Sequence, residues 1–320
     1  MKAIVLAALF AVKGVLAVTM TQASAAEPVK LFSYPHILES APLLVAAEKS
    51  SPEVVVSMAG AIPNLWAGEE VRFPGLADLA GNAETQVLRA SLKHPDVRLI
   101  LTVTEGLYRI VARRSAGISS VADLKGRRVA TQADTSAAYY LKSALATEGL
   151  AEADVQIIAS TPKPMADALI AGKLDAIAIW EPEAERAALV LGADALSLEP
   201  KVAYRELDSL NTTAAVLADA AKRAKIVTFV RTLIGVCRDV SATPERAQAL
   251  YAARSGFDPK VIASAWPHHR FSCTIPDDLL DVLTQEEQWI VTLDKRAPRS
   301  REELAKLVDS SVLKEALAQR

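Results

Sequence analysis

Short β-branched and apolar runs alternate with longer amphipathic runs along the first two thirds of the chain. Strand-like runs occupy residues 29–33, 54–58, 76–80 and 97–104, and helix-like runs occupy residues 41–49 and 83–93. The run VRLILTVT at 97–104 is almost continuously apolar, which is typical of a strand buried on both faces of a sheet. This alternation predicts mixed, mostly parallel sheets that are covered by helices.

The alternation starts again after residue 127. Strand-like runs at 128–131, 155–159 and 175–179 are each followed by a helix-like run, at 135–148, 164–171 and 181–191. One more strand-like run covers residues 214–217, and residues 219–318 have an almost entirely helical pattern. The second series predicts a separate, smaller α/β unit.

No Gly/Ser-rich tract or low-complexity segment separates the two series. We therefore expect the chain to cross between two lobes on strands rather than on a flexible tether, at residues 105–111 and 206–213. The predicted lobes are residues 27–106 plus 210–320, and residues 107–209. The predicted fold class is a two-lobed α/β fold with mixed, mostly parallel sheets and a helical C-terminal extension.

The first 26 residues have the pattern of a secretory signal peptide. Lys2 precedes an apolar run, and small residues end the segment at Ala23-Ser24-Ala25-Ala26, so cleavage is expected after Ala25 or Ala26. Lys13 interrupts the apolar run. An uncleaved anchor helix is the alternative, but only 17 residues separate Ile4 from Met20 inclusively, whereas a membrane span needs about 20. We expect export to a periplasm without an anchor.

The length and net charge of the chain indicate how many compact units it forms and which partners are not expected. A chain of 320 residues is long enough for two compact units. Its formal net charge of -2 provides no basic excess for binding phosphate backbones, so a nucleic-acid partner is not expected. Cys237 and Cys273 could form a disulfide in an exported protein, while Cys237 also lies in an apolar helical run where a buried thiol is equally reasonable.

The sequence offers no pattern for catalysis or for a bound metal. His268 and His269 are adjacent, so they do not share one helical face, and no acidic or His-rich loop accompanies them. Spacings typical of a Ser/His/Asp or Cys/His catalytic site, and Gly-rich phosphate loops, are not found. We therefore predict no catalytic residues, no metal and no cofactor.

Three segments resemble a known family. SVADLKGRRVA at 120–130 is similar to the "DLKGK-V" signature of type II periplasmic binding proteins. ALIAGKLDAIAIWEP at 168–182 resembles the corresponding stretch of nitrate/sulfonate/taurine-type (SsuA/THI5-like) binding proteins, and TQADTS at 131–136 lies where that family has a Gly/Ser/Thr-rich turn. The resemblance implies the periplasmic solute-binding component of an ABC importer. It implies a monomer that closes on a small polar organic or oxyanion solute and docks on a membrane permease paired with an ATPase.

Candidate ligand-binding residues follow from a general rule. In doubly wound sheets, ligands lie at the carboxyl ends of strands, beside the N-termini of helices. The residues expected at these positions are Tyr34, His36, Asn82, Glu84, Thr85, Thr104, Glu105, Thr131, Thr135, Ser136, Trp180, Glu181 and Asn211.

These candidates point to two ligand chemistries. The Thr135-Ser136 turn at a helix start favours an anion, although it could equally be a plain N-cap, and Asp134 beside it would repel an anion. Trp180 could line the cleft or fill the core. Glu105 needs a partner, and Arg109, Arg113 or a ligand amine could supply it. Together the acids favour a ligand with a cationic or hydrogen-donating group.

Two other functions fit the same fold. One is an enzyme resembling the thiamine-pyrimidine (THI5) branch, which would need a reactive His or Cys beside the cleft. The other is a periplasmic subunit that senses a ligand and presents it to a receptor. The leader pattern and the positions of His and Cys favour solute transport over the enzyme.

Overall fold

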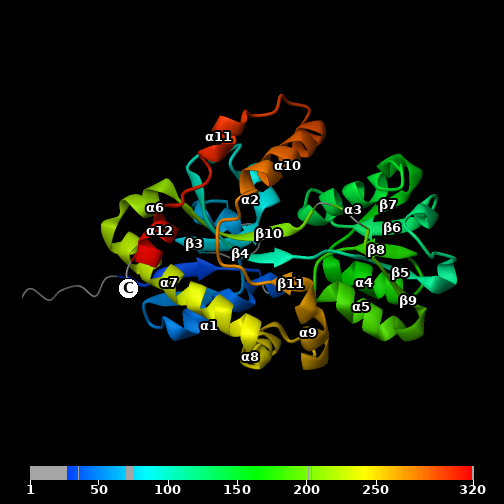
Figure 1. The fold of residues 1–320 in the computed structure, drawn as a ribbon, viewed down its shortest axis with the longest axis horizontal. Coiled ribbons are helices and arrows are strands. Elements are labelled where there is room, and N and C mark those ends of the chain that lie inside the picture. Colours follow the sequence, from blue (N-terminus) through cyan, green and yellow to red (C-terminus); the bar gives the residue numbers. More distant parts are fainter. Residues whose placement is uncertain (1–26, 35, 70–74, 201, 203, 319–320) are drawn as a thin grey trace, which may run out of the picture.

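The computed structural model describes residues 27–34, 36–69, 75–200, 202 and 204–318, and these residues form two lobes that lie side by side (Figure 1). The predicted signal peptide, residues 1–26, lies outside the described residues. Each lobe is built on its own sheet, which confirms the predicted two-lobed α/β fold. No helix among the described residues has the length and apolar character that crossing a membrane requires.

The larger lobe contains a six-stranded sheet in the order β11-β4-β10-β3-β1-β2. Strands β1, β2 and β3 run parallel, whereas β10 is antiparallel to both β3 and β4, and β11 is antiparallel to β4. The sheet is therefore mixed, with more antiparallel pairing than the sequence predicted. The strands are β1 (Val29–Phe32), β2 (Val54–Ser57), β3 (Leu79–Ala83), β4 (Val97–Gly106), β10 (Glu206–Thr213) and β11 (His269–Arg270).

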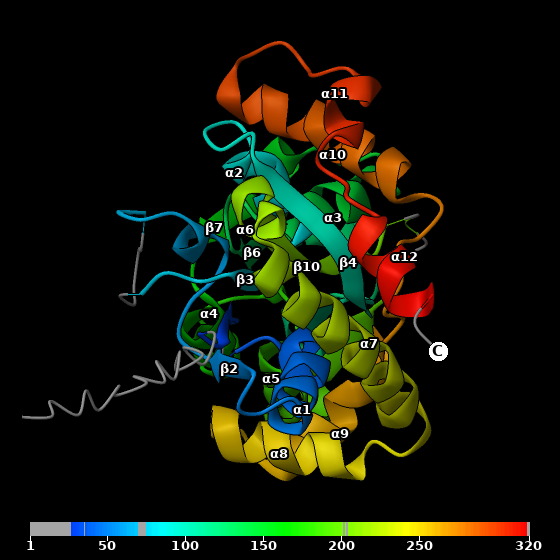
Figure 2. The same ribbon diagram turned by 90° about the vertical axis from the view of Figure 1, so that its left-hand side faces the viewer.

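Helices cover both faces of this sheet, as Figures 1 and 2 show. One face packs against α1, α7, α8 and α12, and the opposite face packs against α2 and α10, with α11 beside α10. The helices of this lobe are α1 (Ala41–Lys49), α2 (Glu84–Ala90), α6 (Ala214–Ala218), α7 (Ala220–Ala242), α8 (Glu245–Ser255), α9 (Pro259–Ala265), α10 (Leu279–Asp294), α11 (Arg301–Ala305) and α12 (Ser311–Ala318).

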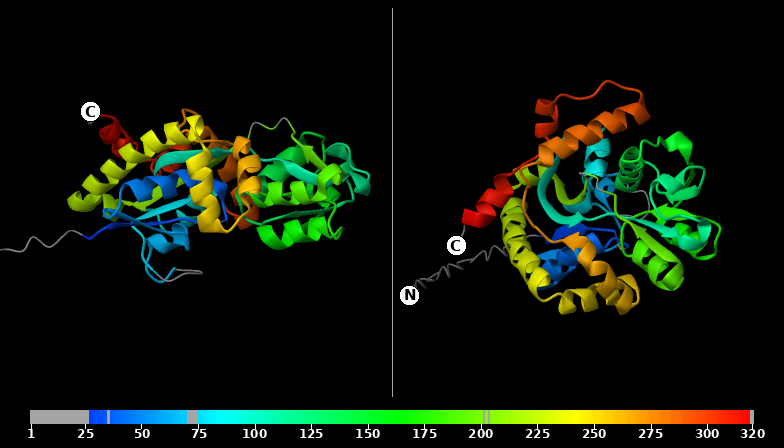
Figure 3. Two further views of the ribbon diagram at one scale, coloured as in Figure 1. Left: turned by 90° about the horizontal axis from the view of Figure 1, so that it is seen from below. Right: turned by 45° about the vertical axis from the view of Figure 1, so that its right-hand side comes forward.

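The smaller lobe contains a five-stranded sheet in the order β7-β6-β8-β5-β9, with helices on both sides (Figure 3). Strands β6, β7 and β8 are parallel, and β5 is antiparallel to β8 and β9. The elements are β5 (Ile110–Arg113), β6 (Arg128–Thr131), α3 (Ser136–Ala146), β7 (Gln156–Ala159), α4 (Pro162–Ile170), β8 (Ala176–Ala178), α5 (Glu183–Leu191) and β9 (Ala195–Leu198).

Several predicted elements need correction. The strand predicted at 76–80 lies at Leu79–Ala83, and the strand predicted at 214–217 is helix α6. Thr213 caps that helix, because its hydroxyl accepts a hydrogen bond from the Val216 N–H. Strands β5, β9 and β11 were not predicted, and they are at most four residues long.

The second predicted crossing is also wrong. All of β10 pairs within the larger sheet, so the chain returns to the larger lobe in the segment between Leu198 and Glu206. The first crossing lies within the predicted 105–111, between Gly106 and Ile110. The exact lobe boundaries remain predictions, although β10 places residues 206–209 with the larger sheet.

Cys237 and Cys273 form a disulfide in the structure. The bond joins α7 to the segment after β11, and both residues are buried in the main core of the larger lobe. Of the two alternatives left open by the sequence, the structure therefore has the disulfide.

Removing the disulfide should destabilise the larger lobe, because the bond closes a loop with a sequence separation of 36 residues. A C237A/C273A variant is expected to lose about 2–4 kcal/mol of unfolding free energy. Urea denaturation of the variant and of the oxidised and reduced wild type measures this loss. Reduction should have no further effect on the variant, and equal midpoints for all three proteins would contradict the bond's contribution.

Candidate functional site

Two pockets lie between the lobes and share Tyr34 in their walls. The smaller one, which we call the inner pocket, has a volume of about 160 Å³, and the larger one, the outer pocket, has a volume of about 690 Å³. The inner pocket is lined by Tyr34, Ile37, Ala61, Asn82, Ala83, Gln86, Gln132, Thr135, Ser136, Trp180, Glu206 and Asp208.

The sheet register explains why the inner pocket forms. Strand β3 ends at Ala83, and β10 begins at Glu206 and runs antiparallel to β3, so Asp208 pairs with Ala83 at the same edge of the sheet. On the other side, Gln132 follows β6 and Trp180 follows β8. The pocket thus occupies the edge where the parallel strands of both sheets end, as expected for this class of sheet.

Two acidic side chains of β10 line the inner pocket. Glu206 and Asp208 are two residues apart in one strand, so their side chains are on the same face of the sheet. Asp208 is only 1% exposed, and neither of its Oδ atoms has a hydrogen-bond partner among the described residues. Glu206 Oε1 accepts a hydrogen bond from Ser136 Oγ at 3.1 Å, while its Oε2 has no such partner.

Further buried acids lie close to this pair. Burial and the neighbouring carboxylates Glu39 and Glu84 raise the pKa of both Glu206 and Asp208 well above the usual range. Burial and Glu84 do the same to the pKa of Glu286 on α10. Glu84 itself accepts hydrogen bonds from Tyr204 Oη and the Leu207 N–H, both at 2.8 Å.

His269 is the cationic neighbour of Glu39. Its Nε2 lies 3.4 Å from Glu39 Oε1, and both side chains are buried. Burial alone would lower the pKa of His269, but the Glu39 carboxylate outweighs burial and the pKa is raised. The wall of the inner pocket and the region behind it therefore combine the Glu39–His269 ion pair with buried carboxyl groups whose pKa is raised.

These groups make the folded protein less stable as the pH rises from about 5.5 to 8. In the unfolded chain the carboxyl groups of Glu206, Asp208 and Glu286 lose their protons near pH 4–4.5, whereas the folded protein retains them to higher pH. The unfolded state then binds fewer protons, so stability falls with pH. The raised pKa of His269 acts in the same direction, because its stabilisation is lost as the pH passes that value.

The melting temperature at pH 5.5 should therefore exceed that at pH 8, and E286Q should reduce the difference because it removes one of these protons. Circular-dichroism melts at matched ionic strength measure both effects. D123N is the control, because the pKa of Asp123 is about 2 and its carboxyl stays ionised in this window. A melting temperature that rises with pH would disprove the buried protonated cluster.

The smaller lobe contributes hydrogen-bond donors to the inner pocket. Ser136 begins helix α3, whose N-terminus carries a partial positive charge. Thr135 is the N-cap residue, but its hydroxyl donates to the Gln132 carbonyl at 2.7 Å instead of capping the helix. Trp180 Nε1 is buried and has no hydrogen-bond partner in the described structure.

Contacts across the mouth of the inner pocket join the two lobes. Gln86 Nε2 of α2 donates to the Asp134 carbonyl at 3.0 Å, and the Arg89 guanidinium lies 3.8 Å from the Asp134 carboxylate. Asp134 has a φ of 59°, which directs the chain into the start of α3. Its carboxylate is therefore part of a contact between the lobes, and it does not line the pocket.

A buried ion-pair network lies near the first crossing. Arg109 donates to Glu181 Oε1 through Nε at 3.0 Å and Nη2 at 2.8 Å, and it also pairs with Glu185. Ser264 of α9 donates to Glu185, so the network reaches the larger lobe. Glu181, Glu185 and His268 lie close enough together to hold a metal ion, but the Arg109 guanidinium already bonds to both carboxylates.

Loss of Arg109 should be strongly destabilising, because it would leave two carboxylates buried without their cation. R109M is expected to lose about 3–5 kcal/mol of unfolding free energy. R114M, which removes an exposed arginine of the same lobe, is the control. Urea denaturation tests this expectation, and E181Q/E185Q combined with R109M should recover part of the loss. An R109M midpoint equal to that of R114M would show that the network adds no stability.

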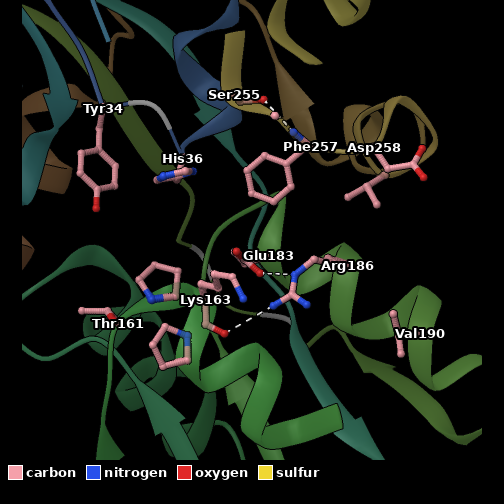
Figure 4. Close-up of a pocket in the computed structure, with 14 residues that line it drawn as sticks. Tyr34, His36, Thr161, Lys163, Glu183, Arg186, Val190, Ser255, Phe257 and Asp258 are labelled. Atoms are coloured by element: carbon pink, nitrogen blue, oxygen red, sulfur yellow. Dashed lines mark hydrogen bonds and ion pairs between the residues drawn. The ribbon is translucent and has the colours of Figure 1, made fainter. Parts of the chain in front are cut away.

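The outer pocket extends from Tyr34 between α4 and α5 of the smaller lobe and the α8–α9 segment of the larger lobe (Figure 4). On one side, the His36 ring contacts Tyr34 and Phe257 edge to face, with centroid distances of 5.9 and 5.8 Å. On the other side, Arg186 bonds to Glu183 (Figure 4), and Lys163 Nζ donates to Asp167 Oδ2 at 2.7 Å. The remaining lining residues are Thr161, Pro162, Pro164, Val190, Ser255, Gly256, Asp258 and Val261.

The structure brings together six of the predicted ligand-binding residues. Tyr34, Asn82, Thr135, Ser136 and Trp180 line the inner pocket, and His36 lines the outer pocket with Tyr34. Their role in ligand binding remains a prediction.

The other predicted residues lie outside both linings. Four of them make contacts within the protein. Glu84 and Glu181 accept the hydrogen bonds described above. Thr104 Oγ1 donates to the Glu39 carbonyl and Asn211 Nδ2 donates to the Ser209 carbonyl, both at 2.9 Å. Glu105 pairs with Arg205, which is neither of the arginines expected and is not a ligand. Thr85 and Thr131 are buried.

Sequence reasoning missed the two acids of β10. The strand was predicted, but as a crossing between the lobes, so its side chains were not considered as part of a pocket. The available signal was the spacing of Glu206 and Asp208, which puts two carboxylates on one face of an otherwise buried strand. Gln132, which lies in a predicted strand-to-helix turn, and Gln86, which lies in the first turn of a predicted helix next to the candidate Thr85, were also missed.

Comparison with known proteins agrees with the architecture. An aliphatic sulfonates-binding protein of Escherichia coli (strain K12) is 30% identical over 184 residues, which are 56% of this chain and 55% of that protein. The chain thus spans about half the length of the curated relative it matches. The alkanesulfonate-binding protein SsuA from Xanthomonas axonopodis pv. citri, bound to MOPS, has a TM-score of 0.68 at 20% identity, covering 88% of this chain and 98% of that one.

An enzyme has the same fold. The desulfurization enzyme DszB, in complex with biphenyl-2-sulfinic acid, has a TM-score of 0.63 at 15% identity, covering 91% of this chain and 99% of that one. The fold alone therefore does not separate binding from catalysis. The family is shown by sequence, because the model of the family described as "NMT1/THI5 like" matches residues 69–253, more than half of the chain. The chain belongs to the NMT1/THI5-like family.

Proposed function

We propose that this protein binds a small solute between its lobes and delivers it to an ABC importer. The observation that carries the proposal is the pair of adjoining pockets, whose walls come from both lobes. A solute held there contacts two separate sheets at once, so binding favours a closed arrangement of the lobes. The similarity to sulfonate-binding proteins supports this function.

The connections between the lobes suit a hinge. The first is the short segment between β4 and β5, and the second is the segment between β9 and β10. Few backbone dihedrals need to change in such segments for one lobe to rotate against the other. The contacts of Gln86 with Asp134 and of Ser136 with Glu206 join the lobes on either side of the inner pocket, and they would break as it opens.

Binding explains the site better than catalysis does. The two cysteines of the chain are joined in the core of the larger lobe, and neither lines a pocket. His36 lies at the outer pocket, but its ring packs against two aromatic rings rather than beside a hydroxyl or thiol nucleophile. We therefore propose a solute-binding role without covalent chemistry.

Localisation and partners follow from the same proposal. The signal-peptide pattern and the family support a periplasmic location, where the closed form would dock as a monomer on a permease paired with a cytoplasmic ATPase. These partners are macromolecules of the inner membrane, and the transported solute is the small-molecule partner.

A ligand screen tests the proposal directly. Nitrate, alkanesulfonates, taurine, thiamine precursors and small amines would be added to the purified protein, and melting temperature and radius of gyration would be followed. A solute at about 100 times its Kd stabilises the folded state by about 2.7 kcal/mol, which corresponds to a shift of roughly 5 °C for a protein of this size. Closure should also reduce the radius of gyration measured by small-angle X-ray scattering.

A61W and A218W form a matched pair for this screen. Ala61 lines the inner pocket, so a tryptophan there should fill it and abolish the shift, whereas Ala218 is exposed on α6 and its substitution should have no effect. A shift that persists in A61W, or conversion of a bound compound into product, would contradict the proposed function.

A further inference from the structure

The acidic wall of the inner pocket lacks a cation. The Asp208 carboxyl is buried with no hydrogen-bond partner for either oxygen among the described residues, and Glu206, whose carboxyl interacts with Glu39, lines the same wall. A buried charged or polar group without a partner destabilises the folded state, and native proteins usually supply a partner. An unpartnered carboxyl in the wall of a pocket indicates that the missing partner of Asp208 is the ligand.

The nearby cations of the protein are already paired elsewhere. His269 lies against Glu39, Arg109 bonds to Glu181 and Glu185, and Arg89 contacts Asp134 and Asp294 across the mouth. None of these three lines the inner pocket. With Glu39 and Glu84 behind the wall, the local charge therefore disfavours a simple anion at Asp208.

A metal ion fits this wall poorly. Within the described residues, the group of acidic and histidine side chains with ligand atoms close enough for a metal is Glu181, Glu185 and His268, and it excludes both acids of the pocket. The inner pocket has a volume of about 160 Å³, which is far more than a single ion needs. An organic cation can fill that volume and donate several hydrogen bonds at once.

We propose that the inner pocket binds the ammonium or amidinium head of an organic solute, which donates hydrogen bonds to Asp208 and Glu206. This assignment rests on the proposed solute-binding function and names the solute class. The head replaces the protons that the buried carboxyl groups otherwise hold, so each acid becomes a carboxylate paired with a cation.

Two other features describe the rest of the solute. Trp180 Nε1 is a buried, unpaired donor in the opposite wall, so the solute carries an acceptor atom near its cationic head. The outer pocket adjoins the inner one at Tyr34 and is several times larger, so the body of the solute extends past Tyr34 toward His36 and Phe257. The solute is thus larger than a bare inorganic anion.

Three probes with the same three-carbon chain test this assignment: propylammonium, propane-1-sulfonate and 3-aminopropane-1-sulfonate. Isothermal titration calorimetry at pH 7.5 gives the affinity of each. The aminosulfonate should bind about tenfold or more tightly than propane-1-sulfonate, because a hydrogen bond to a charged group is worth about that much. Propylammonium should also bind, and titration in buffers of different ionisation enthalpy should show that the amines release protons on binding.

D208N removes the charge and keeps the shape of the side chain. It should weaken the aminosulfonate and propylammonium about tenfold or more and leave propane-1-sulfonate unchanged or tighter. E286Q is the matched control, because Glu286 is an equally buried acid of the same cluster that does not line the pocket, and its affinities should equal those of the wild type. Thermal melts check that both variants fold.

The outcomes separate the two proposals. Tighter binding of propane-1-sulfonate than of the aminosulfonate, or equal losses in D208N and E286Q, would overturn the cation assignment while solute binding stands. In that case the protonated carboxyl groups donate to an oxyanion. Binding of none of these probes by a folded wild-type protein would overturn the cation assignment, and failure of the whole ligand screen would overturn the proposed function as well.

Discussion

The position of β10 between β3 and β4 is the constraint on which the rest of the site depends. Hydrogen bonding on both sides fixes the register of this strand, so Glu206 and Asp208 stay at the edge where the two lobes meet. A shift of one residue would move both side chains to the opposite face of the sheet. The same register places Glu206 opposite Gly106, whose missing side chain leaves room for carboxylate oxygens about 3 Å from where a Cβ would lie.

The buried acidic residues are of two kinds, those that pair with an arginine and those that do not. Where a guanidinium is available, as for Glu181 beside Arg109 and Glu287 beside Arg296 and Arg299, the carboxyl group is held in an ion pair and the pair is structural. The pKa of Glu287 is lowered to about 2 by these arginines, against the opposing effect of burial. Around the inner pocket the acids outnumber such partners, and burial together with neighbouring carboxylates raises the pKa of Glu206, Asp208 and Glu286.

Much of the fold could be predicted because hydrophobic periodicity is local. Helix α1 begins and ends where the pattern indicated, and the uninterrupted apolar run of β4 identified a central strand. The predicted position of β3 was wrong because Leu79–Ala83 contains small residues and an asparagine and has no β-branched residue, so its composition gives little indication of a strand. The strand predicted at 214–217 was wrong for a different reason. The short apolar run of α6 fits a strand as well as a helix, so its periodicity does not distinguish the two.

The site was only partly predictable, since pockets depend on contacts between distant segments. The rule for strand ends located Asn82, Ser136 and Trp180, but the outer pocket combines residues near 161–164 with residues near 255–258, and nothing local links them. The partner of Glu105 is 100 residues away, at Arg205. Pairing of this kind is fixed by the tertiary fold and leaves no mark on either segment.

The contact of Gln86 with the Asp134 carbonyl has a kinetic consequence. If a solute binds between the lobes as proposed, this contact must break for the lobes to separate, so its strength would contribute to the rates of entry and escape. Strengthening this bridge would slow both entry and escape, and the equilibrium affinity would then rise only to the extent that the closed form is favoured. For the proposed delivery of a solute, a few weak contacts such as those of Gln86 and Arg89 with Asp134 would be better suited than a permanent bridge.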